Sequence, residues 1–201
     1  RYTTDGSEPT EWNGMDYTDL NQITDTLCLR AAAFAPGYLP SRTRTHSYIY
    51  LNSVPNQSNY PPGFPGDWGT SYGSTVFSPG SATPGLVPAD YEMDADPLRV
   101  DPNNPASDID PVKLQRLKDG LRELPIVSIV MNNADMFWGS AGMYWYPNVT
   151  SKTFPDKACS VEMVLPDGST AFTADCGITG HGNASREPNK NPKHGFKLNF
   201  V

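Results

Sequence analysis

The sequence predicts a mainly β protein of the α+β type with one short helix. Proline accounts for 20 of the 201 residues, about twice its ordinary usage, which disfavours long helices. β-branched and aromatic residues gather in short runs between turn residues, as is typical of strands. Mean hydropathy is -0.50, and no run approaches the roughly 20 apolar residues of a membrane-spanning helix. We therefore expect no membrane span.

The formal charge of -7 is unevenly distributed along the chain. Residues 1–110 carry 14 acidic and 5 basic side chains, whereas residues 111–201 carry 8 acidic and 10 basic ones. The acidic first half would repel a phosphate backbone, so nucleic acid is not an expected partner. The three cysteines are too few for a disulfide-built miniprotein.

Residues 1–51 form the first predicted region, a small piece of β-sandwich. Asp5-Gly6 is a strong turn signal, the run 27–35 suits a buried strand, and the run 45–51 is rich in β-formers. The chain starts at Arg1 without an initiator methionine or a signal segment. We therefore expect a piece of a longer protein.

Three strings in this region carry a resemblance: YTTDGSEPT, TDTLCLRAAAFAPGYLPS and THSYIY. Together they resemble the later strands of the immunoglobulin-like domain at the C-terminus of chitobiases and β-hexosaminidases. The resemblance implies a secreted accessory module without catalytic residues of its own. It also implies a partial sandwich, whose first strands would precede Arg1.

Residues 52–106 form the second predicted region, a long connecting segment rich in proline and glycine. It contains 10 of the 20 prolines, which lack an N–H donor and fit poorly into regular structure. Its aromatic residues lead us to expect that it lies against a domain. Trp68 and Phe77 could stack on a sugar, or they could anchor the segment by packing, which we favour.

The acidic run 90–96 offers oxygen ligands for calcium within this segment. An EF-hand needs glycine at the sixth position and glutamate at the twelfth, but the run has Ala95 and Asp101 there. We predict a solvated acidic turn and no metal site.

Residues 107–201 form the third predicted region. Asp110-Pro111 suits a helix start, leucines recur at helical spacing from 114 to 124, and Pro125 ends the pattern. The runs 126–131 and 142–146 suit strands, and the runs 159–165 and 170–178 flank a turn at 166–168, which predicts a hairpin.

Two registers are open to this hairpin. A two-residue turn at Asp167-Gly168 places Cys159 opposite Cys176 and pairs apolar residues throughout. Pro166 instead favours a type I turn with Gly168 in a bulge, which would move the register by one residue and put the cysteines on opposite faces. We favour the apolar match, which predicts a disulfide. Two buried thiols are the alternative.

From Leu124 onward, several motifs occur in the order found in one family. LPIVSIVMNNADMFWGSAGMYWYPN, SVEMVLPDGSTAFTADCGITGHGNASR and PKHGFKLNF resemble the N-terminal part of the CotH kinase family, the spore-coat-protein-H-like atypical protein kinases. The family's glycine-turn motif corresponds to residues 177–182. There Thr179 stands for an arginine and Gly180 for an aliphatic residue.

The resemblance implies a site for nucleotide phosphates. Arg186, Lys193 and Lys197 match basic positions of the family, and a glycine-rich turn would let backbone N–H groups approach phosphate oxygens. ATP and magnesium are expected cofactors of the complete protein and are not expected for this piece. We nominate no catalytic residue and no metal ligand, and the three histidines form no ligand set.

Two functions from different classes remain open. The first is a fragment of a secreted multidomain bacterial CotH-like protein, which as a whole would be an ATP-dependent protein serine kinase, with the fragment itself inactive. The second is a non-catalytic cell-surface or carbohydrate-associated module. Both readings imply a secreted or cell-surface location, with a protein substrate, a surface polysaccharide or the remainder of its own chain as partner.

Overall fold

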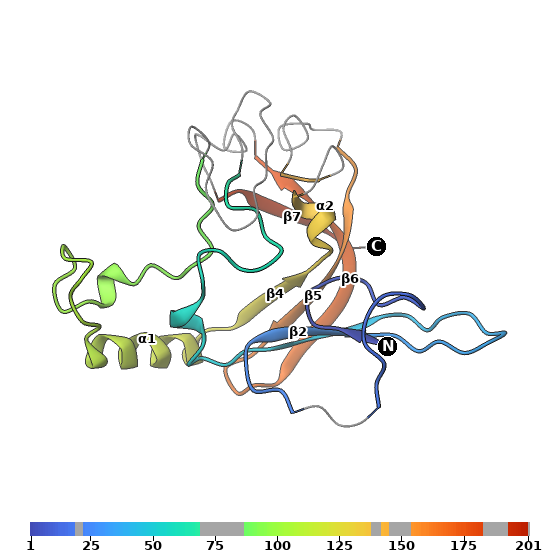
Figure 1. Cartoon of the computed structure of the whole chain (residues 1–201), viewed down its shortest axis with the longest axis horizontal. Coiled ribbons are helices and arrows are strands. Elements are labelled where there is room, and N and C mark those ends of the chain that lie inside the picture. Colours follow the sequence, from blue (N-terminus) through green and yellow to red (C-terminus); the bar gives the residue numbers. More distant parts are fainter. Residues whose placement is uncertain (19–21, 69–86, 138–141, 145–153, 183–192, 201) are drawn as a thin grey trace.

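The protein is built from two antiparallel β-sheets with little helix, so the predicted mainly β class is confirmed (Figure 1). The computed structural model describes residues 1–18, 22–68, 87–137, 142–144, 154–182 and 193–200. No helix in these ranges is long and apolar enough to cross a membrane.

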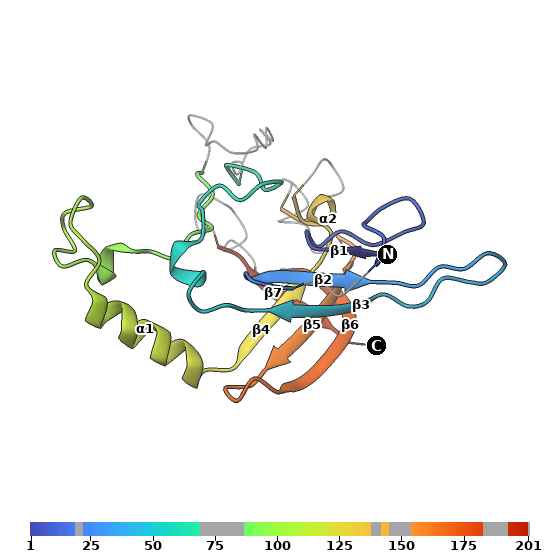
Figure 2. The same cartoon turned by 60° about the horizontal axis from the view of Figure 1, so that its bottom comes forward.

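The first sheet has the strand order β1-β2-β3. Its strands are β1 (Tyr2–Thr3), β2 (Leu27–Ala31) and β3 (Arg44–Tyr48). β2 lies within the predicted run 27–35, and β3 starts one residue before the predicted run 45–51. Both strands end earlier than expected. A long hairpin between β2 and β3 projects away from the sheet (Figure 2).

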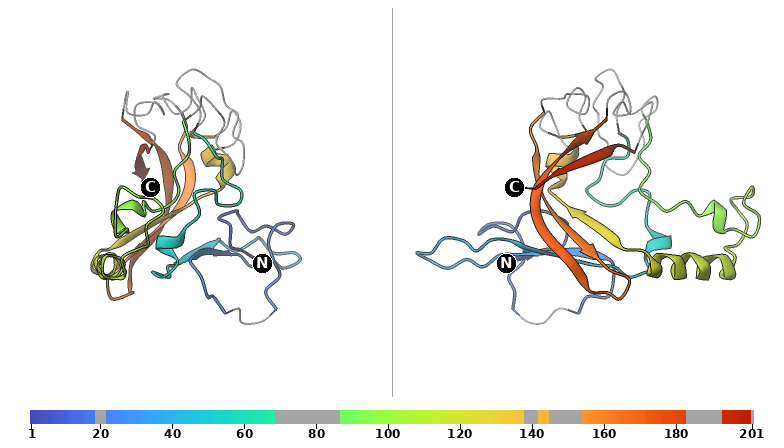
Figure 3. Two further views of the ribbon diagram at one scale, coloured as in Figure 1. Left: turned by 60° about the vertical axis from the view of Figure 1, so that its left-hand side comes forward. Right: turned by 180° about the vertical axis from the view of Figure 1, so that it is seen from behind.

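The second sheet has the strand order β4-β5-β6-β7. Its strands are β4 (Ile126–Val130), β5 (Lys157–Val164), β6 (Thr170–His181) and β7 (Gly195–Asn199). Seen from behind, the long β6 curves strongly, so the sheet curls along this strand (Figure 3).

Helix α1 (Pro111–Glu123) follows the prediction closely. The Asp110 side chain accepts hydrogen bonds from the backbone N–H groups of Val112 and Lys113, which caps the first turn. The helix ends before Pro125, which cannot continue it. Two 3₁₀ turns, η1 (Val54–Asn56) and η2 (Asp96–Leu98), lie in the connecting segment.

The predicted strand at 142–146 is wrong over the residues that the structure describes. Helix α2 (Asn133–Phe137) was not anticipated, and residues 142–144 follow as a turn that binds back to it. The N–H groups of Met143 and Tyr144 donate to the carbonyls of Asp135 and Met136. Because Met143 and Tyr144 are buried, these bonds satisfy groups that would otherwise have needed a neighbouring strand.

The β5–β6 hairpin satisfies both of its competing sequence signals. The Leu165–Ser169 turn has Gly168 at φ 82° and a hydrogen bond from the Gly168 N–H to the Leu165 carbonyl, as the proline-led turn requires. The register then shifts by one residue beyond Val164. This bulge restores the apolar match and places Cys159 opposite Cys176.

The apolar face of the second sheet carries the main core. Cys159, Val161, Cys176 and Ile178 are buried there, with Met131 and Met143 packed against them. Ile178 is fully excluded from solvent. The opposite face of the same strands is polar, as the period of two requires.

The polar face of the second sheet meets the first sheet through a buried carboxylate. The side chain of Glu162 on β5 is 3% exposed, and its Oε1 lies 2.7 Å from Nδ1 of His46. Its Oε2 accepts from the backbone N–H of Ser47 at 2.8 Å, and the hydroxyl of Thr170 donates to Oε1 at 3.1 Å. The strands of the first sheet thus lie across those of the second (Figure 2).

Two hydroxyl pairs extend this contact. Ser47 and Ser128 share a hydrogen bond at 2.6 Å, and the Thr45 hydroxyl donates to Ser160 at 3.1 Å. Ser160 in turn donates to Asp175. Hydrogen bonds from β3 to both β4 and β5 therefore join the two sheets, and each bond depends on the position of β3 against these strands.

Replacing Glu162 by alanine should lower the free energy of unfolding by about 2 kcal/mol, because the bonds that His46, Ser47 and Thr170 make to its carboxylate would be lost. Urea unfolding measures the change. Glu92, an exposed carboxylate, provides the control, since Glu92→Ala should stay within about 0.5 kcal/mol of the parent. An equal loss of unfolding free energy in the two variants would contradict a stabilising role for Glu162 between the two sheets.

The cysteine pair carries a second prediction. The structure has Cys159 and Cys176 as free thiols with Sγ atoms 3.5 Å apart, so the disulfide itself stays a prediction. Burial, and then the hydrogen bond with Cys176, raise the pKa of Cys159 to about 12, which disfavours the thiolate needed for exchange. We expect slow bridging of the folded protein by oxidised glutathione and faster bridging during refolding.

Mass spectrometry after peptide digestion checks this outcome. The bridged form lacks two hydrogen atoms and links the Cys159 and Cys176 peptides, while Cys28 is left out. Exclusive pairing of Cys28 with either residue would refute the prediction.

Candidate functional site

The structure describes two of the three basic residues expected to contact phosphate. Lys197 is exposed on β7, opposite Thr179 of β6. Lys193 lies just before β7, where its ammonium pairs with the Asp90 carboxylate at 2.8 Å. Arg186 lies outside the described residues. Lys197, unlike Lys193, forms no ion pair with another described residue.

The glycine-rich turn expected at 177–182 is wrong for residues 177–181. These residues belong to β6 and pair with β7, from Gly177 opposite Asn199 to His181 opposite Gly195. Backbone groups that form a sheet ladder do not form the cluster of free N–H groups that cradles a phosphate. Gly177 instead makes room for Asp156, since an added Cβ would lie 2.9 Å from the Asp156 Cβ.

Trp68 is a packing residue, as favoured from the sequence. It is 4% exposed and lies in an aromatic cluster with Phe64, Tyr91, Phe137 and Tyr144. Its indole N–H donates to the Tyr91 hydroxyl at 3.1 Å. Burial raises the pKa of Tyr91, and it raises that of Tyr144 to about 12. The aromatic cluster holds this part of the connecting segment against the second sheet, while Phe77 lies outside the described residues.

Several described carboxylates of the second and third regions have structural partners. Asp156 accepts from the Asn199 side chain. Asp167 accepts from Ser169, whose hydroxyl and then backbone hydrogen bonds lower the pKa of that carboxyl. Asp90 pairs with Lys193, and Asp96 pairs with Arg99. Within the described ranges, no three His, Cys, Asp or Glu side chains are grouped as metal ligands.

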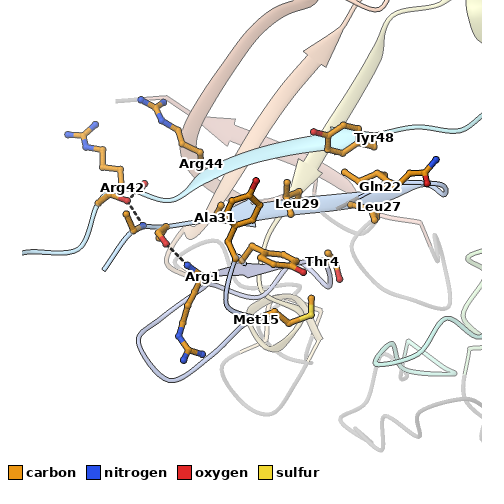
Figure 4. A pocket seen from close by; sticks show the side chains of 16 residues that line it. Arg1, Thr4, Met15, Gln22, Leu27, Leu29, Ala31, Arg42, Arg44 and Tyr48 are labelled. Carbon is orange, nitrogen blue, oxygen red and sulfur yellow. Dashed lines mark hydrogen bonds between the residues drawn. The ribbon is translucent and has the colours of Figure 1, made fainter. Parts of the chain in front are cut away.

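A recess of about 730 Å³ lies on the outer face of the first sheet. Leu27, Leu29 and Ala31 point to this face from β2, together with Tyr48 and Arg44 of β3 (Figure 4). Leu27, Leu29 and Ala31 alternate with Cys28 and Arg30, which indicates a strand with one apolar face. The prediction of a buried strand for this run did not include an open apolar face.

Residues outside the two long strands complete the recess. Met15 lies over the sheet from the chain that follows β1 (Figure 4). Tyr2, Tyr17 and Ile23 add further apolar area. The result is an apolar floor open to solvent, which is a common form of binding surface.

The recess is cationic at one end. Arg1, Arg42 and Arg44 gather there, and Gln22 lies at the opposite end (Figure 4). Arg1 pairs with Asp16 at 3.2 Å, whereas Arg42 and Arg44 form no ion pair with another described residue. An apolar surface that ends in two unpaired guanidinium groups suits a ligand with both apolar and anionic parts.

A family model described as "Fn3 associated" matches residues 1–48. No curated protein and no solved structure matches the chain. The matched segment comprises β1, β2 and β3 and ends at Tyr48. Residues 1–48 are therefore similar to the Fn3-associated family over the strands that build the recess.

Proposed function

We propose that this chain acts as a non-catalytic binding module of a secreted or cell-surface protein, and that the recess on its first sheet holds the partner. The observation that carries the proposal is the half-buried apolar floor of Leu27, Leu29 and Tyr48 beside Arg42 and Arg44. The Fn3-associated match over the same strands and the sandwich-like resemblance of residues 1–51 support an accessory module.

The attachment of the first sheet supports this role. The hydrogen bonds of Ser47, His46 and Thr45 to the second sheet use the inner face and free edge of β3. His46 shares the outer face with Leu29, its partner on β2, but it does not line the recess. A module held in this way presents a fixed apolar surface, and a preorganised surface costs less conformational entropy on binding.

The anionic dye 8-anilinonaphthalene-1-sulfonate is a direct probe of this surface. We expect saturable binding that Leu29→Asn weakens about fivefold, because part of the apolar contact is lost. Val112→Asn on α1, which removes an exposed apolar side chain elsewhere, should leave binding unchanged.

A second pair of measurements separates charge from apolar contact. The double variant Arg42→Ser with Arg44→Ser should weaken binding of the sulfonate dye and should not affect the uncharged dye N-phenyl-1-naphthylamine. Dye binding that ignores both the Leu29 variant and the arginine variants would refute the recess as a binding surface.

Nucleotide binding by the second sheet is the other candidate function. Lys197 projects from β7 and has no ion-pair partner among the described residues, and the CotH-kinase resemblance assigns such a lysine to phosphate. In a complete kinase of that family, ATP with magnesium would donate its γ-phosphate to a protein serine. The fit here is partial, because Lys193 is already paired with Asp90 and residues 177–181 are committed to a strand.

Thermal-shift titration with ATP and magnesium tests this second candidate. If Lys197 binds phosphate, millimolar nucleotide should raise Tm, and Lys197→Ala should remove most of the shift, since a charge-assisted contact is lost. Lys118→Ala on α1 is the matched control and should retain the shift. An unchanged Tm for the parent protein at millimolar nucleotide would count against this candidate.

A further inference from the structure

The loop at residues 4–14 is closed by a backbone pair and is separate from the recess floor. The Tyr2 N–H donates to the Met15 carbonyl at 2.9 Å, and the Met15 N–H donates to the Tyr2 carbonyl at 2.8 Å. Gly14 permits this closure, since its φ is 96° and an added Cβ would lie 2.7 Å from the Tyr2 carbonyl oxygen. Compact loops with adjoining ends often carry function.

Side-chain hydrogen bonds hold the tip of this loop in one shape. The Thr10 hydroxyl accepts from the N–H groups of Trp12 and Asn13 at 3.2 and 2.9 Å. The Asn13 amide donates to the Ser7 hydroxyl and the Glu8 carbonyl. The base of the loop is anchored by buried Arg30, which donates to the Gly6 carbonyl at 2.9 Å and pairs with Glu8.

Trp12 is displayed by this ordered loop with 91% of its surface exposed. A shallow groove of about 340 Å³ separates the loop from the β2–β3 hairpin. Trp12, Phe34 and Pro40 supply its apolar walls, and Glu11, Thr10 and Ser41 supply oxygen atoms along it. The indole thus forms a continuous apolar surface with Phe34 and Pro40 beside oxygen atoms, an arrangement that suits a ligand with an apolar face and polar groups.

We propose that this groove binds a neutral glycan whose flat sugar face stacks on Trp12. The ring face of a β-1,4-linked glucan presents weakly positive C–H groups, which match the negative face of an indole. Its hydroxyl groups donate to the carboxylate and hydroxyl oxygens beside Trp12. The groove adjoins the recess, with which it shares Ala32 and Ser41. Trp12 does not line the recess, so the proposal does not depend on that part of the proposed function.

The acidic character of the groove favours a neutral glycan over an anionic membrane surface or an acidic peptide as the ligand of Trp12. Glu11 lines the groove without an ion pair to another described residue, whereas Glu8 is paired with Arg30. None of the lining residues, all of which the structure describes, is basic. An anionic membrane surface or an acidic peptide would therefore meet repulsion at Trp12. A neutral glycan meets none, and its hydroxyl groups can donate to the Glu11 carboxylate.

Affinity electrophoresis in native gels with hydroxyethylcellulose tests the proposal on the complete chain. The parent protein should be retarded, and Trp12→Ala should weaken the interaction about tenfold or more, as expected for loss of one stacking platform. Trp12→Phe, which keeps an aromatic face, should retain part of the retardation. Tyr60→Ala, a half-exposed aromatic elsewhere, and Leu29→Asn in the recess should be retarded like the parent.

Unfolding curves for each variant establish that Trp12→Ala remains folded, which its exposure leads us to expect. No retardation of the parent, or equal retardation of the parent and Trp12→Ala, would overturn the proposal. So would Trp12-dependent binding to phosphatidylglycerol vesicles without binding to the glucan. Failure here leaves the dye measurements on the recess unaffected, so the two sites are tested separately.

Discussion

The position of the first sheet depends on one buried carboxylate. Burying Glu162 without partners would cost several kcal/mol, and its partners come from both sheets: Thr170 from β6, and His46 and Ser47 from β3. The Ser47 N–H points away from the β2 ladder, so Glu162 also satisfies the edge of β3 that no strand pairs with. This arrangement holds only in one register, and it therefore sets both the location and the direction of the first sheet.

The polar contact has a consequence for the opposite side of the first sheet. Because Thr45 and Ser47 face the second sheet, strand alternation turns Leu27, Leu29 and Tyr48 outward. A β-sheet normally buries its apolar face in its own core, yet here that face forms the recess. Arg30 points to the inner side and anchors the loop that displays Trp12. Two candidate binding surfaces thus follow from how one small sheet is attached.

Fewer residues than expected are available for the phosphate contacts that the CotH-kinase resemblance implies. Pairing with β7 commits residues 177–181 to a ladder, and Asp90 neutralises Lys193. Lys197 keeps the charge and exposure that a phosphate contact needs. The second sheet therefore offers a single described cation for that chemistry, whereas the first sheet offers a shaped apolar surface. This contrast is the physical reason for preferring a binding module.

The sequence by itself determined the features that local chemistry controls. Proline content and β-rich runs predicted the mainly β class. Asp110-Pro111 and Pro125 marked the two ends of α1. The match of apolar residues in the runs 159–165 and 170–178 placed Cys159 opposite Cys176. These outcomes depend on near neighbours, so the chain encodes them directly. Tertiary structure decided the strand state of 179–181, the contact of Glu162 with the first sheet and the outward face of β2. Each depends on partners in other strands, whose identity no local pattern specifies. The turn at 142–144 depends on its bonds to α2, a helix that the sequence did not predict.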